Sequence, residues 1–358
     1  MSPVRTAILS DLHLGKRERA DLLRHAAPRA ALAEALRPAD QVILLGDVLE
    51  LRDAPVADIL EIALPVLTEL GEAIGDARVV VVPGNHDHQL ASEWLERRRV
   101  ARRPAPLALE QVVKPSRSGL LGRVAGAFSG EVALAYPGVF VRPDVYATHG
   151  HHLDCHVTVP SLEALAVATT ARLAGGPPRP GSLPDDYEQA LVPLYSLLYE
   201  LAQSERRARR PGRTDLSARL WRRVQRQGPH PSSMLLRRAV PLAAAAANRA
   251  GLGPFRADLS IDELGRSGLR AMGEVIERLE IPAAHVVFGH THRAGPLSGD
   301  VSGWARPGGR RLHNCGSWVH EPAFVGARGP ASGHWPGRLV VVEDDAPPRL
   351  EQVLERLP

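Results

Sequence analysis

The stretch "VVVVPGNHD", residues 79–87, is an apolar run that ends abruptly in polar side chains. Four consecutive valines are typical of a strand that is covered on both faces, and the Pro-Gly pair indicates a turn directly after it. A turn does not explain why an amide, an imidazole and a carboxylate follow at residues 85–87. We interpret the stretch as a buried strand and the polar residues at its tip as candidate site residues.

Four further apolar runs end in the same way. They are "TAILSDLH" (6–13), "QVILLGD" (41–47), "DVYATHGHH" (144–152) and "AHVVFGHTH" (284–292). Helical patterns at 18–37 and 57–75 separate the first three strands, which predicts a βαβαβ unit with right-handed crossovers. After residue 292, the segments "RRLHNCGSWV", "GRLVVVED" and "RLEQVLERL" predict a return to strands.

The composition is that of a soluble globular protein. The chain has 358 residues, of which 44% are hydrophobic and 23% charged, so it can bury a large core. Its net charge of +4 allows an anionic partner without naming one. Two cysteines far apart in sequence argue against a disulfide framework, and we find neither a signal peptide nor a transmembrane segment. We therefore expect a cytoplasmic protein.

The middle of the chain has a different character from its ends. Residues 97–130 are expected to form an exposed basic connector. Residues 156–279 contain no convincing strand, and their patterns predict helices at 160–174, 185–210, 215–227, 232–250 and 259–279. We interpret 1–155 and 280–358 as an α/β core, and 156–279 as a helical insertion that forms a cap or lid.

Each predicted strand of the core delivers polar side chains at its carboxyl end, where ligands bind in open α/β sheets. These side chains are Asp11, His13, Asp47, Asn85, His86, His149, His290 and His292. Alternation along a strand predicts that Asp11 and His13 face the same side, and likewise His290 and His292. Carboxylate, imidazole and amide ligands suit Mn, Fe or Zn, and their number suits two ions that share one carboxylate, about 3.5–4 Å apart.

Simpler explanations exist for each motif alone. A Gly-Asp pair after a strand is often only a turn, and Asn-His-Asp can cap a helix. Five such motifs at the ends of five strands are not explained in this way.

The motifs resemble those of a known family. "DLH" (11–13), "GDVLE" (46–50), "GNHD" (84–87), "HG" (149–150) and "GHTH" (289–292) are similar to the five motifs of the calcineurin-like metallophosphoesterases, and "NCGS" (314–317) is similar to the "NPGS" that often follows them. The resemblance covers residues 4–155 and 280–345. It implies a four-layer α/β/β/α sandwich around a dinuclear metal site, with a large helical insertion in this chain.

The resemblance also implies a role for each motif residue. One metal would be bound by Asp11, His13 and His292, the second by Asn85, His149 and His290, and Asp47 would bridge them. His86 would be the catalytic histidine, and Glu50 stands where many relatives have the acid that orients it. Leu51 stands where protein phosphatases carry a phosphate-gripping arginine, so that activity is not expected. Candidate substrate-binding residues are Arg52, His151 and His152.

These roles predict a dinuclear metal-dependent hydrolase of phosphoester or pyrophosphate bonds. The two divalent ions (Mn, Fe or Zn) would supply hydroxide from a bridging water, and His86 would assist the leaving group. "SDLHLG" and "GDVLE" together resemble the UDP-2,3-diacylglucosamine pyrophosphatases, although the insertion here is longer than their lids. We therefore expect a small nucleotide- or lipid-linked substrate, with specificity set by the insertion, whose apolar helices could also touch a membrane surface.

Two rival functions remain open at this point. A nuclease of the same superfamily would use the basic segment 205–226, but the insertion has few aromatic residues on which bases could stack. A metal-binding scaffold without turnover would keep the fold, but it would not need His86 beside an intact ligand set.

Overall fold

The computed structural model describes residues 4–204, 241–258, 260–298, 300 and 303–357. Its described strands form one connected sheet path in the order β10-β9-β1-β2-β3-β5-β6-β7-β8, and β4 pairs with β5 beside this path. The strands are β1 (Arg5–Leu9), β2 (Gln41–Leu45), β3 (Arg78–Val82), β4 (Glu110–Val113), β5 (Val132–Arg142), β6 (Val145–Thr148), β7 (His285–Phe288), β8 (Arg311–Asn314), β9 (Arg338–Glu343) and β10 (Arg349–Gln352).

The first half of the core is the predicted βαβαβ unit. Strands β1, β2 and β3 are parallel, with Ile8 opposite Ile43 and Ile43 opposite Val80. The crossovers are α1 (Ala26–Leu36), preceded by the short η1 (Leu22–Arg24), and α2 (Val56–Ile74). Both helices bury their leucine-rich faces against this leaf of the sheet, as the helical spacing of those leucines predicts.

Strand β5, which the sequence motifs do not reveal, joins two leaves of the sheet. Its first residues pair with β3 in parallel, and its residues from Gly138 onward pair with β6 in antiparallel fashion. The strand changes leaf around Pro137 and Gly138, residues that normally argue against a central strand. Because β5 turns there, the carboxyl ends of β6 and β7 return to the same edge as those of β1, β2 and β3.

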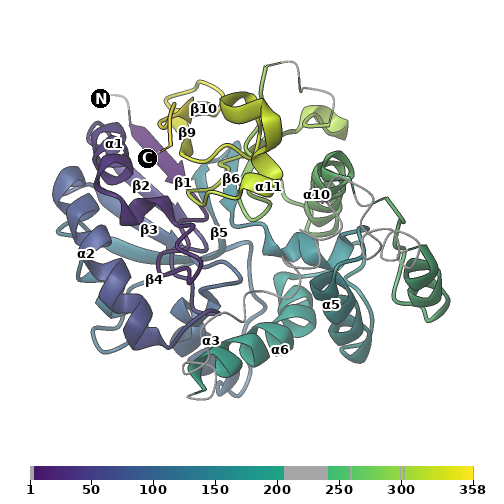
Figure 1. The fold of residues 1–358 in the computed structure, drawn as a ribbon. Helices are drawn as coiled ribbons and strands as arrows, with labels where there is room; N and C mark the ends of the chain where they lie inside the picture. The colour runs from purple at the N-terminus through teal and green to yellow at the C-terminus, as the bar shows by residue number, and fades with distance from the viewer. Residues whose placement is uncertain (1–3, 205–240, 259, 299, 301–302, 358) are drawn as a thin grey trace.

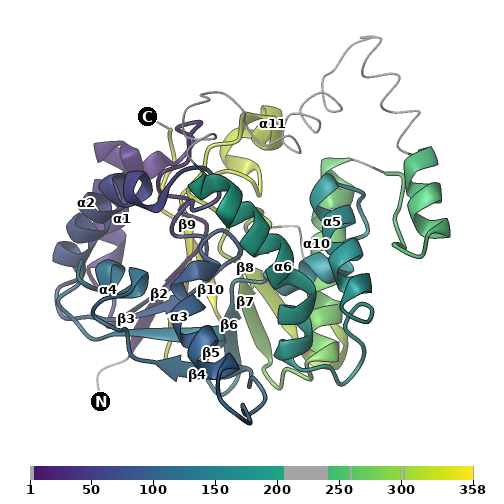
Figure 2. The same ribbon diagram turned by 90° about the horizontal axis from the view of Figure 1, so that it is seen from below.

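Three apolar clusters separate four structural layers. One lies between α1, α2 and the β1–β3 leaf, one between the two leaves, and one between the β6–β8 leaf and the helices on its far side. The central cluster includes Ile8 and Val80 from one leaf with Ala147 and Val287 from the other. Figures 1 and 2 show α1 and α2 on one side of the strands and α10 (Ile261–Arg278) on the other. The predicted α/β/β/α sandwich is confirmed.

The described part of 156–279 is helical. It contains α5 (Leu162–Leu173), α6 (Pro184–Gln203), a helix at 241–249 and α10, and the predicted helix at 215–227 lies outside the described residues. Helix α10 packs Met272 and Ile276 against Val286 and Leu312 of the second leaf, in one cluster with parts of α5 and α6. The insertion therefore supplies the outer helical layer of that leaf.

Helix α6 is anchored to the core at both of its ends. Near its start, Arg98 donates to Asp185 at 2.7 Å, and at its end the backbone N–H of Val56 donates to Gln203 at 2.9 Å. These contacts bind α6 to the first residue of α2 and to the last turn of α3 (Ser92–Arg99).

The segment 97–130 is less simple than a connector. Residues 101–106 are exposed as expected, but 110–113 form β4 and 120–125 form α4 (Leu120–Ala125), which buries Leu121 and Val124. The prediction of one exposed connector is thus wrong for these two elements, because the basic residues of the surrounding segment obscure the few apolar residues that the two elements bury. The remaining short helices are η2 (His88–Leu90), η3 (His151–His156), η4 (Pro307–Gly309), α11 (Pro322–Val325) and η5 (Gly326–Ala331).

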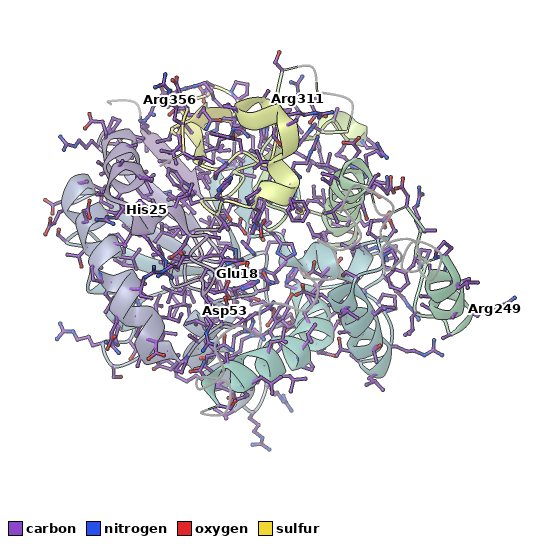
Figure 3. All side chains as sticks on the ribbon, viewed as in Figure 1. Glu18, His25, Asp53, Arg249, Arg311 and Arg356 are labelled. Atoms are coloured by element: carbon purple, nitrogen blue, oxygen red, sulfur yellow. The ribbon has the colours of Figure 1, made fainter. Side chains whose placement is uncertain are left out.

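Side chains fill the space between the layers, while charged residues such as Arg249, Arg311 and Arg356 lie at the outside (Figure 3). Among the described residues, no helix has both the length and the apolar character needed to cross a membrane.

Candidate metal centre

The predicted site residues lie in the loops directly after β1, β2, β3, β6 and β7. Strand β1 ends at Leu9 and β7 ends at Phe288, so Asp11, His13, His290 and His292 are not strand residues. The expectation that strand alternation aligns these pairs is therefore wrong, although the side chains do converge.

Left-handed turns, rather than strand alternation, direct these side chains. Five of the converging residues have positive φ, between 45° and 65°: Asp11, His13, Asp47, His290 and His292. Such a conformation costs a non-glycine residue on the order of 1–3 kcal/mol and persists only where the surroundings enforce it. Its repetition at five positions of one site is a feature typical of functional loops.

One group of ligand atoms brings together the ends of β1 and β7. Asp11 Oδ1 lies 3.3 Å from His292 Nε2 and 3.7 Å from His13 Nε2. The Nε2 atoms of His13 and His292 are 3.1 Å apart. Asp11 and His13 are almost fully buried, so these atoms face one another rather than solvent.

A second group brings together the ends of β2, β3, β6 and β7. Asp47 Oδ2 lies 3.3 Å from His149 Nε2, and the Asn85 carboxamide lies 3.2 Å from His149 Nε2 and 3.1 Å from His290 Nδ1. Asp47 Oδ2 is also 3.7 Å from His13 Nε2 in the first group. Asp47 thus stands between the two groups.

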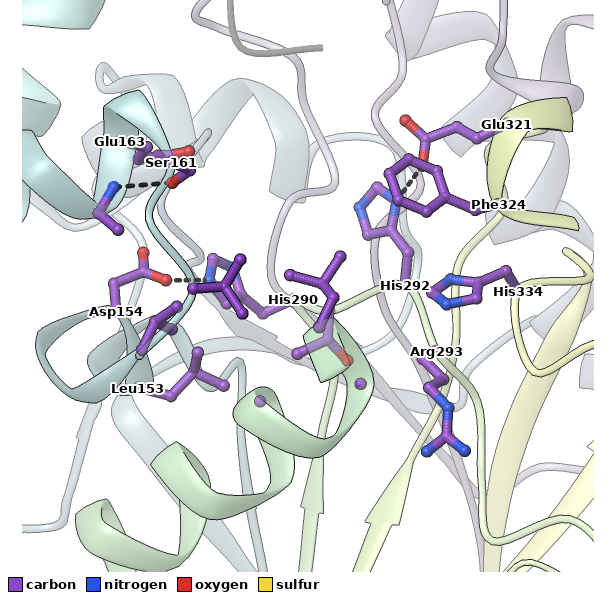
Figure 4. Close-up of a pocket in the computed structure, with 17 residues that line it drawn as sticks. Leu153, Asp154, Ser161, Glu163, His290, His292, Arg293, Glu321, Phe324 and His334 are labelled. Atoms are coloured by element: carbon purple, nitrogen blue, oxygen red, sulfur yellow. Dashed lines mark hydrogen bonds and ion pairs between the residues drawn. The ribbon is translucent and has the colours of Figure 1, made fainter. Parts of the chain in front are cut away.

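Carboxylates stand behind three of these imidazoles and fix their orientation. Glu50 contacts His13 Nδ1 at 2.9 Å and His86 Nδ1 at 2.6 Å. Asp154 lies 2.8 Å from His290 Nε2, and Glu321 lies 3.1 Å from His292 Nδ1 (Figure 4). A carboxylate or carbonyl behind a ligating imidazole is the usual second layer of a metal site.

His149 completes this pattern, because its Nδ1 lies 2.9 Å from the carbonyl oxygen of Leu45. Of these acids, the sequence motifs pointed to Glu50. Glu321 was missed, because a single acid in "SWVHEP" carries no recognisable signal.

A fourth carboxylate, that of Asp87, holds the loop after β3 in place through hydrogen bonds. Asp87 is fully buried and accepts from the backbone N–H groups of Gly84 at 2.7 Å and Val48 at 2.8 Å. Gly84 allows the close approach that results, since a Cβ there would lie 2.2 Å from Asp47 Oδ1. The last residue of "GNHD" therefore ties the second and third motif loops together.

The donor set of the site fits cations. Asp11 Oδ1 is buried and has no hydrogen-bond partner among the described residues, while two imidazole nitrogens lie within 3.7 Å of it. An unmatched buried carboxylate oxygen is costly unless a positive charge compensates it. Groups of three candidate ligands with mutually close donor atoms are Asp11, His13 and His292, and Asp47, His149 and His290.

The Asn85 carboxamide gives a second indication. Hydrogen bonding alone would turn its nitrogen toward Asp47, His149 and His290 and its oxygen toward Arg52 Nη1, at 3.1 Å. Ligation of a cation requires the opposite, with the amide oxygen facing the imidazoles. The orientation of this amide thus depends on whether a cation is bound.

Electrostatics in the metal-free site are dominated by close acid–imidazole pairs. Burial alone would raise the pKa of Asp11, but His13, His149 and His292 outweigh it and hold the pKa well below its usual range. Burial lowers the pKa of His149 and His292, but the neighbouring carboxylates raise these pKa values to about 9 and about 10. A cation that binds to His149 and His292 would therefore have to displace protons from these two imidazoles.

Two of the candidate substrate-binding residues do not line the pocket described below. His151 and His152 are buried against Glu188 of α6, and the His151 ring lies 5.7 Å from the His149 ring between centroids. Arg52 is nearer the site: its Nη1 lies 3.1 Å from Glu163, and its guanidinium stacks over the Tyr195 ring at 4.8 Å. The basic segment 205–226, considered for nucleic acid, lies outside the described residues, and Tyr187 and Tyr195 are too buried to stack on bases.

A pocket of about 310 Å³ opens beside the imidazoles of His290 and His292 (Figure 4). It lies between η3, α5, α10 and α11. Apolar side chains line part of it, namely Leu153, Val157, Val159, Ala164, Leu264 and Phe324, and polar ones such as Ser161, Glu163 and Arg293 line the rest. The insertion thus contributes one wall of a cavity that reaches the metal-binding edge.

Comparison with known proteins agrees with this geometry. A family model described as calcineurin-like phosphoesterase matches residues 4–170. Among solved structures, a dimetal phosphatase from Danio rerio is similar at 12% identity with a TM-score of 0.33, over 98% of this chain and 99% of that chain. A likeness at that level carries no information on the site. Comparison with curated proteins finds no match.

Proposed function

We propose that this protein is a calcineurin-like phosphoesterase that works with two divalent cations held at the edge of its sheet, a proposal supported by the family model that matches residues 4–170. The proposed ligands are Asp11, His13 and His292 for one ion, Asn85, His149 and His290 for the other, and Asp47 between them. The supporting observation is the convergence of buried acceptor atoms, above all Asp11 Oδ1, without matching donors among the described residues. UDP-2,3-diacylglucosamine pyrophosphatase activity is one candidate within this proposal.

Two bound cations would activate a water molecule by lowering its pKa, and they would neutralise charge on the phosphoryl oxygens. His86 is the residue best placed to assist the leaving oxygen. Its backbone N–H donates to Asp47 Oδ1 at 2.7 Å, its Nδ1 is held by Glu50, and its side chain is 24% exposed. The ring is therefore fixed on its inner side, and Nε2 is left to exchange a proton with substrate.

We propose that Arg52 binds a phosphoryl oxygen. With the Asn85 oxygen turned toward a cation, the amide N–H₂ and Arg52 Nη1 become two donors about 3.1 Å apart. Adjacent donors with no acceptor between them favour an anionic oxygen that accepts from both. Burial and the Glu163 and Tyr195 contacts fix the guanidinium, so it would bind substrate without reorganising.

The pocket beside His290 and His292 supports a substrate with an apolar group next to its phosphoester. An acyl or aryl group would bury apolar area against side chains such as Leu153, Val159 and Leu264. Ser161, Glu163 and Arg293 line the same pocket and can hydrogen-bond the polar groups of a linked sugar or nucleotide. Among the substrates expected from sequence, a lipid-linked one carries the apolar group that this lining would bury.

The proposal is tested by a hydrolysis panel on metal-reconstituted protein, with Asp47→Ala as the inactive control. The panel compares a nitrophenyl monoester, a nitrophenyl diester, a UDP-linked acyl sugar and single-stranded DNA. An Ala164→Leu variant, which narrows the pocket, should raise KM for the acyl substrate and leave the nitrophenyl esters unaffected. Fully metallated protein that hydrolyses none of these would favour a scaffold instead, and preferred cleavage of DNA would favour a nuclease.

A further inference from the structure

A second cluster of metal-ligand side chains lies behind the centre just described. His151 and His152 belong to η3, and Glu188 belongs to α6. One ligand atom from each of the three lies within 4.8 Å of the others. All three residues are buried, with exposures of 1%, 4% and 8%. Nothing in the proposed phosphoesterase chemistry uses them.

Hydrogen bonds do not satisfy this cluster. His152 Nε2 points at Glu188 Oε1 from 3.9 Å, which is too long for a hydrogen bond, and it has no partner among the described residues. His151 Nδ1 is likewise buried without a partner in the part of the chain that the structure describes. A buried imidazole nitrogen without a hydrogen-bond partner is unfavourable, so two adjacent cases point to a ligand.

The side chains of the cluster are of the types that bind a transition-metal cation. One carboxylate with two imidazoles is a donor set that binds zinc with three protein ligands.

Outer contacts already orient the carboxylate. Tyr136 O–H donates to Glu188 Oε1, and His88 Nε2 lies 3.1 Å from Glu188 Oε2. The His152 ring stacks on Tyr187 with 4.7 Å between centroids, which fixes its plane. Partners of this kind, behind the ligand atoms, are what a metal site requires to keep its geometry.

We propose that His151, His152 and Glu188 bind one further divalent transition-metal ion, zinc by preference, separate from the catalytic pair. The ion would join α6 of the insertion to η3, which follows His149 directly in the chain. It would thereby lock the outer helical layer to the loop that carries a proposed catalytic ligand.

Zinc titration of the full-length, chelator-stripped protein, followed by elemental analysis, tests the proposal. Wild-type protein should bind three zinc ions per chain, Glu188→Gln two, and Asp47→Ala only one. Glu274→Gln, which alters a surface pair with Arg278 on α10, is the matched control and should bind three. Wild-type protein that saturates at two ions, with none retained by Asp47→Ala, would overturn the proposal.

A second measurement covers the case in which Glu188→Gln fails to fold. Wild-type crystals soaked in zinc should show an anomalous peak about 2.0–2.1 Å from His152 Nε2. A soaked crystal with density at the catalytic pair but none beside Glu188 contradicts the third site. The test is independent of the proposed function, because zinc retained by Asp47→Ala supports this site even if no phosphoester is hydrolysed.

Discussion

Replacement of Glu50 by glutamine separates the two tasks that its carboxylate performs. The carboxylate accepts from His13 Nδ1 at 2.9 Å and His86 Nδ1 at 2.6 Å, and it is buried. Glutamine offers one oxygen and one N–H₂, so it can accept from only one of these imidazoles. If the oxygen serves His86, then His13 must carry its proton on Nε2, the atom that faces Asp11 and His292.

The expected loss follows from that geometry. Removing a second-layer partner typically costs 10–100-fold in metal affinity, which is about 1.4–2.8 kcal/mol. In the opposite orientation of the amide, His86 loses its acceptor, and turnover at saturating metal should fall by on the order of 10- to 100-fold. Glu50→Gln should therefore weaken both metal binding and catalysis.

Metal affinity is measured by competition with a chromophoric chelator, and turnover with a nitrophenyl diester at saturating metal. Glu69→Gln, which alters a half-exposed pair with Arg29, serves as the matched control and should behave as wild type. Unchanged metal affinity together with unchanged turnover in Glu50→Gln would refute the reasoning.

Three other outcomes are expected. His86→Ala should keep both catalytic ions while its turnover drops by about 10²–10⁴-fold, whereas Asp47→Ala should lose both ions and all activity. Elemental analysis measures the bound metal, and metal loss in His86→Ala would contradict the role assigned to His86. Gly84→Ala should lower the free energy of unfolding by on the order of 1–3 kcal/mol and weaken metal binding, because the added Cβ would lie 2.2 Å from Asp47 Oδ1. An unchanged melting temperature would contradict the close contact between Gly84 and Asp47. Because the pKa values of His149 and His292 are raised to about 9 and about 10, their contribution to metal-free stability is complete below pH 6.5 and is lost as pH rises through those values. Metal binding near neutral pH must then release protons and strengthen with rising pH, and calorimetry in buffers of different ionisation enthalpy should detect that release.

Much of the core could be predicted because its strands are short apolar runs that end in polar motifs. A loop follows each of these strands, and the loops lie together at one edge of the sheet. The proposed ligands, which these loops carry, therefore converge as the motifs indicate. Strand β5 escaped prediction since Pro137 and Gly138 interrupt it, yet those residues are what let it turn from one leaf to the other. The hydrophobic pattern of a sequence indicates which faces of a strand are buried, but it does not indicate that the strand pairs with different neighbours along its length.

The site shows the same limit. The alternating pattern of a strand does not predict positive φ values such as those at Asp11 and His290. The predicted convergence of the side chains is therefore correct, but its predicted cause, strand alternation, is not. Glu321 comes from a loop with no motif and reaches His292 only through the tertiary fold. Likewise, the pairing of Glu188 with His88, which is 100 residues away, depends on the packing of α6 against the core.

The spread of the ligands along the chain has a consequence for biosynthesis. Each proposed catalytic ion draws a histidine from the loop after β7, at residue 290 or 292, and other ligands from near the start of the chain. A nascent polypeptide must therefore expose more than four-fifths of its length before either position is complete. Metal loading should accordingly follow translation, and truncated chains that end before β7 should capture neither ion of the pair.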